Sequence, residues 1–165
     1  MKTLHIVRHG KSSWDFPEIS DIDRPLIEKG ILNNYLIAER IVNKFLKPDL
    51  IYTSAAIRCI HTAIIFARAI GVDLRNIQIK SNIYEAETSS IVDLIEETSS
   101  DINNLLIVGH NPTFTNLANL YLTDYIENLP TSGVVTLNFD TKNWNIIDKQ
   151  PISTEIDFPQ KRLIL

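Results

Sequence analysis

Three short segments of the sequence carry histidine and arginine in patterns that could bind a phosphoryl group. They are Arg8-His9-Gly10, the pair Ser54 and Arg58, and Gly109-His110-Asn111-Pro112. The forked guanidinium of arginine matches phosphate oxygens bidentately. Helix N-termini next to such segments also favour anions through their free N–H groups and the helix dipole. The ligand that suits this combination is a phosphoryl group.

Each of these segments follows a predicted β-strand. Short β-rich or continuous apolar runs occupy residues 3–7, 50–53 and 105–108. The last run is typical of a strand that is buried on both faces of a sheet. In open α/β sheets, ligands bind outside the carboxyl ends of the strands. We therefore expect all three segments to open onto one edge of the same sheet.

Apolar residues at helical spacing predict helices between these strands. Ser54 is expected to be the N-cap of the second helix, and Asn111 that of the fourth, with Pro112 in its first turn. The expected helices cover residues 28–46, 55–70, a segment around 91–95, and 112–122.

The remaining apolar runs complete the expected fold. A short strand is predicted at 77–79, and a terminal hairpin of strands at 134–139 and 144–148 closes the sheet. The segment after Pro151 is expected to run along an edge as strand or coil. Because strands and helices alternate with short links, the pattern predicts a three-layer α/β/α sandwich, mostly parallel with an antiparallel edge, in a single domain over residues 1–165.

The composition is that of an ordinary globular protein. The 165 residues are 44% hydrophobic and 22% charged, which excludes disordered and fibrous classes. A net charge of -4 argues against a broad nucleic-acid interface, which needs a basic face. Cys59 is the only cysteine, so an intramolecular disulfide and a Cys-based zinc site are excluded. Without a signal peptide or a long apolar stretch, we expect a cytoplasmic monomer with no membrane partner.

Four segments, taken in order, resemble the histidine phosphatase superfamily, in particular its short SixA-like phosphohistidine phosphatase branch. They are residues 4–14, residues 23–26, Ser54 with Arg58 and Thr62, and residues 108–112. The resemblance covers most of the chain and implies a phosphoglycerate mutase-like fold. Two positions depart from the family pattern: Ala55 stands where a proline is usual, and His61 stands where a glutamine is usual. Neither change replaces a charged phosphate ligand.

The resemblance implies that His9 is the nucleophile that takes the phosphoryl group, and that Arg8, Arg58 and His110 bind it. Nearby arginine charges would keep the imidazole neutral by lowering its pKa. Glu85 stands where related enzymes carry their proton donor, and it is expected to protonate poor leaving groups. Four further residues are expected to contact substrate: Lys11, Ser12, Arg24 and Asn111.

An alternative role remains open for Arg24, which lies between Asp23 and Pro25 and also fits a braced turn.

No metal or other cofactor is expected, because His5 and His61 have no acidic or thiolate ligands at matching spacing and the arginines would repel a cation.

The sequence favours a metal-independent phosphatase that acts on phosphohistidine in a protein, such as a phosphotransfer domain. One alternative is a phosphatase for small phosphomonoesters. A second alternative is a non-catalytic domain that binds phosphate, but binding alone would not need a nucleophile beside a second imidazole.

Overall fold

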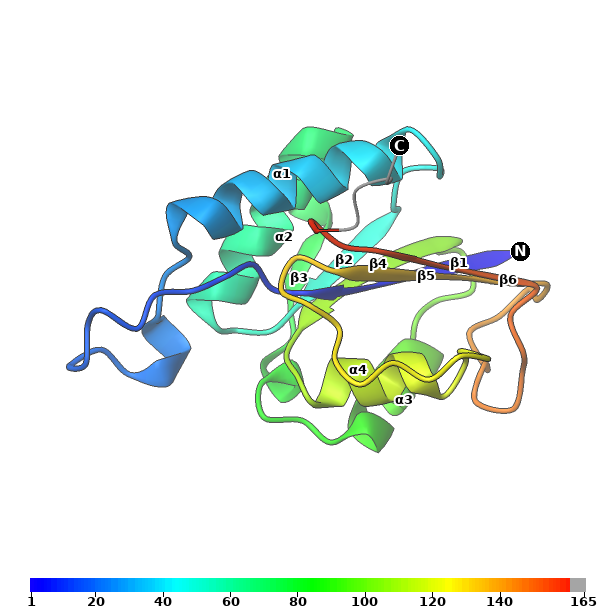
Figure 1. The fold of residues 1–165 in the computed structure, drawn as a ribbon. Coiled ribbons are helices and arrows are strands. Elements are labelled where there is room, and N and C mark those ends of the chain that lie inside the picture. Colours follow the sequence, from blue (N-terminus) through cyan, green and yellow to red (C-terminus); the bar gives the residue numbers. More distant parts are fainter. Residues whose placement is uncertain (161–165) are drawn as a thin grey trace.

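A six-stranded sheet with helices on both faces forms the centre of the computed structural model, which describes residues 1–160 (Figure 1). The strand order is β3-β2-β4-β1-β5-β6. The first four strands are parallel, whereas β5 runs antiparallel to β1 and β6 antiparallel to β5. The predicted fold class is therefore confirmed. The strands are β1 Lys2–Arg8, β2 Leu50–Thr53, β3 Ile77–Ile79, β4 Asn104–Gly109, β5 Val134–Phe139 and β6 Ser153–Asp157.

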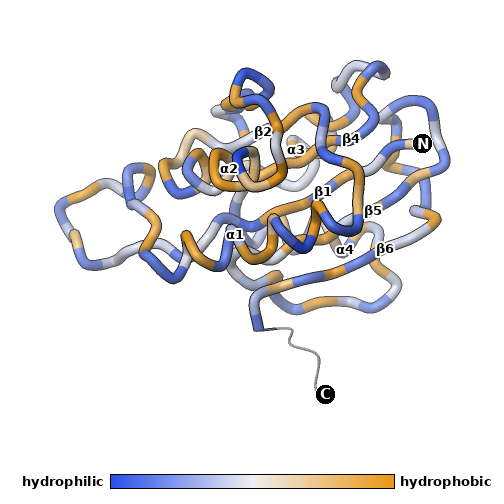
Figure 2. Tube along the Cα trace, turned by 90° about the horizontal axis from the view of Figure 1, so that it is seen from above, coloured by the Kyte–Doolittle hydropathy of each residue, from blue (hydrophilic) through white to orange (hydrophobic). Residues whose placement is uncertain are grey.

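Two helices cover each face of the sheet. Helices α1 (Glu28–Val42) and α2 (Ile57–Ile70) lie together on one face, and α3 (Thr88–Glu96) and α4 (Thr113–Asn119) lie on the other (Figure 1). The tube of α1 alternates between apolar and polar residues, as a helix with one buried face should (Figure 2). Short 3-10 turns occupy Asp21–Asp23 (η1), Leu74–Asn76 (η2) and Ser81–Ile83 (η3). No helix within residues 1–160 is long and apolar enough to cross a membrane.

The alternation of side chains along β1 builds a separate core on each face. Val7 packs in the cluster beneath α1 and α2, together with Ile37 and Phe66. Leu4 and Ile6 point the other way, into the cluster formed with α3 and α4. Nearly every side chain of β1, β2 and β4 is buried because both faces of these strands are covered, which explains the continuous apolar runs in the sequence.

Strand register brings the three polar segments to one edge of the sheet. Arg8 at the end of β1 pairs with Gly109 at the end of β4, and Thr53 at the end of β2 pairs with Val108. The amide of His9 donates to the carbonyl of Gly109 at 3.1 Å. A Cβ atom at Gly109 would lie 2.3 Å from the ring of Phe114, so glycine permits the close approach of α4 to this strand end.

The expected hairpin strand at 144–148 is wrong. This segment is a loop, and the strand that pairs with β5 is β6. Trp144 and Ile146 are fully buried in the core beneath α3 and α4, and the Trp144 indole donates to the carbonyl of Ile102 at 2.9 Å. Their alternate spacing therefore reflects two anchors of a loop rather than a paired strand.

Ser54 is not the N-cap of α2, which was an incorrect prediction. The N-cap is Ala56, because the chain continues in an extended conformation before the helix begins at Ile57. The Ser54 hydroxyl instead lies 2.7 Å from the ring of His110, at the neighbouring strand end. Ser54 is fully buried, and its hydroxyl also accepts a hydrogen bond from the amide of Ala56 at 3.3 Å.

Two helix ends also differ from the expectation. Helix α1 ends at Val42, before the expected boundary of 46, because the chain turns ahead of Pro48. Asn111 is not the N-cap of α4, which was an incorrect prediction, because the N-cap is Pro112. The helix ends at Asn119, before the expected boundary of 122, and the Asn119 side-chain amide bonds both backbone polar groups of Ile126.

Candidate active site

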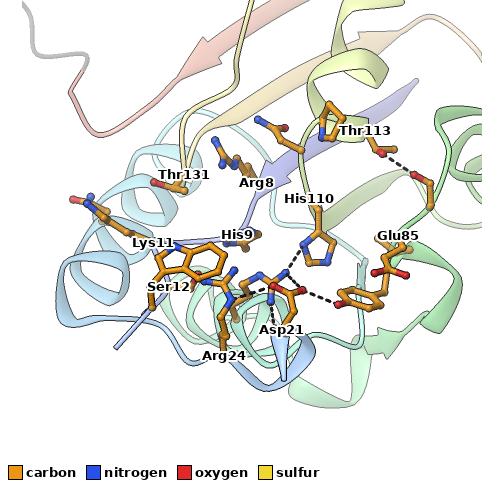
Figure 3. A pocket seen from close by; sticks show the side chains of 18 of the residues that line it. Arg8, His9, Lys11, Ser12, Asp21, Arg24, Glu85, His110, Thr113 and Thr131 are labelled. Atoms are coloured by element: carbon orange, nitrogen blue, oxygen red, sulfur yellow. Dashed lines mark hydrogen bonds and ion pairs between the residues drawn. The ribbon is translucent and has the colours of Figure 1, made fainter. Parts of the chain in front are cut away.

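A cavity of about 770 Å³ opens at the edge where β1, β2 and β4 end. Arginine, lysine and histidine side chains dominate its polar lining, with Asp21 and Glu85 as the lining carboxylates. Figure 3 shows the labelled side chains converging on this space from several separate segments. All nine residues that the sequence analysis assigned to the site line it: Arg8, His9, Lys11, Ser12, Arg24, Arg58, Glu85, His110 and Asn111.

His9 follows directly after β1 and is 8% exposed. Its Nδ1 atom lies 2.7 Å from the carbonyl oxygen of Gly10. Burial lowers the pKa of His9 to about 3, and the charges of His110, Arg58 and Arg8 act in the same direction. The ring is therefore neutral at pH 7, as expected, although burial rather than the arginines is the main cause.

His110 occupies the matching position after β4. Its ring centroid lies 5.3 Å from that of His9. Its Nε2 atom is 2.7 Å from the Ser54 hydroxyl, and its Nδ1 atom is 3.3 Å from Nη2 of Arg58. Burial, followed by the charge of Arg58, lowers the pKa of His110 to about 4. Two neutral imidazoles thus face the same cavity.

The two predicted phosphate-binding arginines have different surroundings. Arg58, in the first turn of α2, is 4% exposed, and its terminal nitrogens donate to the carbonyl and carboxylate of Asp21. Arg8 donates from Nη1 to the carbonyl of Leu129 at 2.9 Å. Within residues 1–160, no acceptor bonds the Nη2 atom of Arg8. One terminal nitrogen of Arg8 is therefore available to a ligand.

Arg24 is buried and lies in the cavity wall. Its guanidinium stacks 3.6 Å from the ring centroid of Trp14 and donates to the hydroxyl of Ser12 at 2.9 Å. The acid that braces it is Asp21, at 3.1 Å, rather than Asp23. Asp23 instead accepts a hydrogen bond from Ser20. The braced-turn interpretation and the position in the cavity are thus compatible.

Asn111 and Glu85 reach the cavity in different ways. The Asn111 amide donates to the carbonyl of Leu129 at 3.0 Å, and its carbonyl oxygen accepts from Thr115 at 2.9 Å. These bonds make Asn111 a link between α4 and the loop before β5. Glu85 also lines the cavity, in a left-handed backbone conformation with φ 55. Within residues 1–160, no hydrogen-bond donor pairs with its carboxylate.

Sequence reasoning missed Asp21 and Tyr84. Asp21 pairs with Arg24 and Arg58, and the Tyr84 hydroxyl donates to the same carboxylate at 2.6 Å. The only signal was an acidic residue in a long polar loop next to the strand end that carries His9. That signal does not distinguish Asp21 from Asp15 or Asp23.

Three other residues with reactive side chains, two histidines and one cysteine, lie outside the cavity lining. His5 is fully buried within β1, with Nδ1 2.8 Å from the Thr136 hydroxyl. His61 lies in α2 and is not among the residues that line the cavity. Cys59 is fully buried, and burial raises the pKa of its thiol to about 12. In the described part of the chain, no group of three histidine, cysteine or acidic side chains could hold a metal ion.

Comparison with known proteins places this geometry among phosphatases. The chain is 29% identical over 142 residues to an uncharacterized protein of Mycobacterium tuberculosis, a match covering 79% of this chain and 85% of that protein. A crystal structure from Agrobacterium tumefaciens, assigned as the phosphohistidine phosphatase SixA, has a TM-score of 0.78 and 26% identity, covering 93% of this chain and 97% of that one.

A second solved structure shares the fold. It is the protein histidine phosphatase SixA complexed with tungstate, with a TM-score of 0.75, 17% identity and coverage of 94% of both chains. Residues 4–90, which carry His9 and Arg58, match the family described as the histidine phosphatase superfamily (branch 1). The chain therefore belongs to branch 1 of the histidine phosphatase superfamily, and it is a SixA-like phosphatase.

Proposed function

We propose that the chain hydrolyses phosphohistidine in proteins, with His9 as the nucleophile. The observation that carries this proposal is the contact between Nδ1 of His9 and the carbonyl oxygen of Gly10, at 2.7 Å. A carbonyl oxygen only accepts hydrogen bonds, so Nδ1 holds the proton of the neutral ring and Nε2 holds the lone pair. Nε2 is therefore the atom that attacks phosphorus.

The reaction proceeds in two displacements. In the first, a bond forms between Nε2 of His9 and phosphorus while the bond to the substrate nitrogen breaks, and the electron pair leaves with the substrate imidazole. In the second, water attacks phosphorus, the bond to Nε2 breaks, and its electron pair returns to His9 as inorganic phosphate forms. Arg8 and Arg58 offset the negative charge on the equatorial oxygens in both transition states.

His110 also stabilises the negative charge on the phosphoryl oxygens. A phosphoryl dianion beside this imidazole raises its pKa, because an opposite charge at short range favours the protonated form. Protonated His110 then donates a hydrogen bond to a phosphoryl oxygen. Its Ser54 contact at 2.7 Å keeps the ring in the cavity wall during this change.

The class of leaving group favours a phosphorylated protein histidine. The imidazole of phosphohistidine leaves as a neutral ring when its other nitrogen carries a proton, so it needs no strong enzymic acid. The similarity to SixA, at 26% identity over nearly the whole chain, supports the same substrate class. The open edge of the sheet also gives a protein-borne group access to His9.

A small phosphomonoester is the second candidate substrate, and Glu85 is the observation that favours it. Its carboxylate lines the same cavity as His9. An alkoxide leaving group needs a proton from such an acid. The two substrate classes therefore differ in whether they require Glu85.

The test is hydrolysis of a protein phosphorylated on histidine, with a chelator present, followed by acid and base quenching of the enzyme. We expect phosphate release and a labelled enzyme whose label is acid-labile and base-stable, as phosphohistidine is. Absence of both release and label, while p-nitrophenyl phosphate is hydrolysed, would contradict the protein substrate. Failure on every phosphate substrate would contradict the catalytic assignment of His9.

A further inference from the structure

We propose that Asp21 is a positioning residue that orients the Arg58 guanidinium for phosphoryl transfer, and that Tyr84 holds the Asp21 carboxylate in place. This inference rests on the proposed phosphatase chemistry at His9. It assigns Asp21 and Tyr84 a role in fixing the orientation of Arg58, one of the two arginines proposed to bind phosphate.

Two atoms of Asp21 hold the two terminal nitrogens of Arg58. Nη1 donates to the Asp21 carbonyl oxygen at 2.5 Å, and Nη2 donates to Oδ2 at 3.0 Å. A planar guanidinium that is bonded at both ends of its fork cannot rotate without breaking both bonds. The Arg58 side chain is 5% exposed and that of Asp21 is 48% exposed, so solvent reaches the carboxylate but hardly reaches the guanidinium.

The Asp21 carboxylate is itself held from two further directions. The Tyr84 hydroxyl donates to Oδ2 at 2.6 Å, and Nε of Arg24 donates to Oδ1 at 3.1 Å. Hydrogen bonds from Tyr84 and from Arg58 lower the pKa of Asp21 to about 2, so the carboxylate is ionised throughout the working pH range. Figure 3 shows Asp21 at the centre of these dashed contacts. The loop before α1, the first turn of α2 and the residue after η3 are thereby joined.

The two hydrogen bonds from Arg58 to Asp21, which we call the clamp, lie next to His110 in the proposed active site. Nη2 of Arg58, the nitrogen that binds the Asp21 carboxylate, also lies 3.3 Å from Nδ1 of His110. The His110 ring is 5.3 Å from the ring of His9. A change in the angle of the guanidinium would therefore move its charge relative to the phosphorus atom that His9 attacks.

A carboxylate beside Arg58 could instead act as an internal anion that competes with phosphate. The contacts argue against this role. The backbone carbonyl of Asp21 is part of the clamp, and it cannot leave unless the η1 turn moves. The side chain has donors from three residues, so it is not free to swing out when a phosphoryl group arrives. A positioning role predicts that removal of the Asp21 negative charge lowers kcat. Competition with phosphate predicts instead that its removal raises kcat/KM.

The experiment compares Asp21→Asn, Tyr84→Phe and the matched control Asp23→Asn, with p-nitrophenyl phosphate as substrate and inorganic phosphate as a binding probe. Asp23 lies in the same η1 turn, outside the cavity lining, and accepts from Ser20. p-Nitrophenyl phosphate separates this test from the question of the natural substrate. Activity of the native enzyme on it is required before any variant is interpreted.

We expect Asp21→Asn to lower kcat at least tenfold while the dissociation constant of inorganic phosphate stays equal or falls. The amide no longer aligns the guanidinium, yet removal of a negative charge strengthens the attraction for an anion. Tyr84→Phe should lower kcat by about threefold to tenfold. The double variant should be no worse than about twofold below Asp21→Asn, because both residues act through Arg58. Asp23→Asn should match the native enzyme.

A lower kcat together with a lower dissociation constant of inorganic phosphate is a result that loss of folded protein cannot produce. A rise in kcat/KM in Asp21→Asn would show that the carboxylate competes with substrate and would overturn the proposal. Equal kcat in Asp21→Asn and Asp23→Asn would also overturn it. If Asp21→Asn does not fold, Tyr84→Phe by itself tests the proposal, because an unchanged kcat in that variant contradicts the positioning role.

Discussion

His9 Nδ1 lies 2.7 Å from the carbonyl oxygen of Gly10, the residue that follows it. This backbone contact determines which ring nitrogen carries the proton, and it leaves the lone pair on Nε2, the atom that we propose as the nucleophile. Burial of the ring lowers its pKa to about 3, so that form persists at neutral pH. The local turn after β1 therefore selects the tautomer of His9, and burial of the ring keeps it neutral.

Replacement of His9 by alanine should abolish turnover. The nucleophile is lost, but Arg8, Arg58 and His110 remain, so vanadate or inorganic phosphate should still bind in weakened form. Turnover of p-nitrophenyl phosphate and calorimetric binding of phosphate measure the two effects. His61→Ala, outside the cavity lining, is the control and should keep full activity. An undiminished rate in His9→Ala would contradict the proposed mechanism.

Arg58→Ala should lose at least about 2 kcal/mol of transition-state stabilisation, the scale for removing one preorganised charge-stabilising group. Arg58→Lys should be nearly as poor, because a point charge cannot reproduce the fork that Asp21 holds. The measurement is kcat/KM on p-nitrophenyl phosphate. Full activity of the lysine variant would show that the fork geometry of Arg58 is unimportant.

Glu85→Gln should separate the two candidate substrate classes. An alkyl phosphate monoester should be slowed far more than p-nitrophenyl phosphate, whose phenolate leaves unaided, or phosphohistidine, whose imidazole is protonated by solvent. Initial rates on the three substrates, with native and variant protein, measure the difference. A native enzyme that is fast only on phosphohistidine, with little effect of the substitution, supports the protein substrate. Equal slowing of all three would refute a protonation role for Glu85.

The free energy of unfolding should fall as the pH drops below about 6.5. Burial lowers the folded-state pKa of His5 to about 4, whereas a histidine in the unfolded chain titrates near 6.5. Between these values the unfolded chain binds more protons, so stability present at pH 7 is lost on acidification. The loss is at most about 1.4 kcal/mol per pH unit for one such histidine.

Urea unfolding at pH 7.0 and pH 5.0 checks this dependence. His5→Asn removes the titrating ring while keeping a polar group near Thr136, so its stability should depend less steeply on pH than that of the native protein. His61→Asn, on the partly exposed side of α2, is the matched control and should retain the native slope. Identical slopes for native protein and His5→Asn would contradict the prediction.

Much of the fold could be predicted because strong local patterns match the final structure. The apolar runs of β1, β2 and β4 need two covered faces, and that need alone implies a layered α/β fold. The prediction of a hairpin strand at 144–148 was wrong because burial of Trp144 and Ile146 produces the same alternation of apolar and polar residues as a strand. Periodicity reports which side chains are buried, and it cannot tell whether a strand or a loop buries them.

The amino-acid sequence predicts that arginine and histidine side chains gather where parallel strands end, because residues that directly follow neighbouring parallel strands share one edge of the sheet. The contacts that hold those side chains in place depend on the packing of distant segments. Asp21, Arg58 and Tyr84 are far apart in the chain, and their contacts arise where a loop, a helix and a turn pack around one cavity. No local pattern encodes such contacts, because each depends on the path of the other two segments.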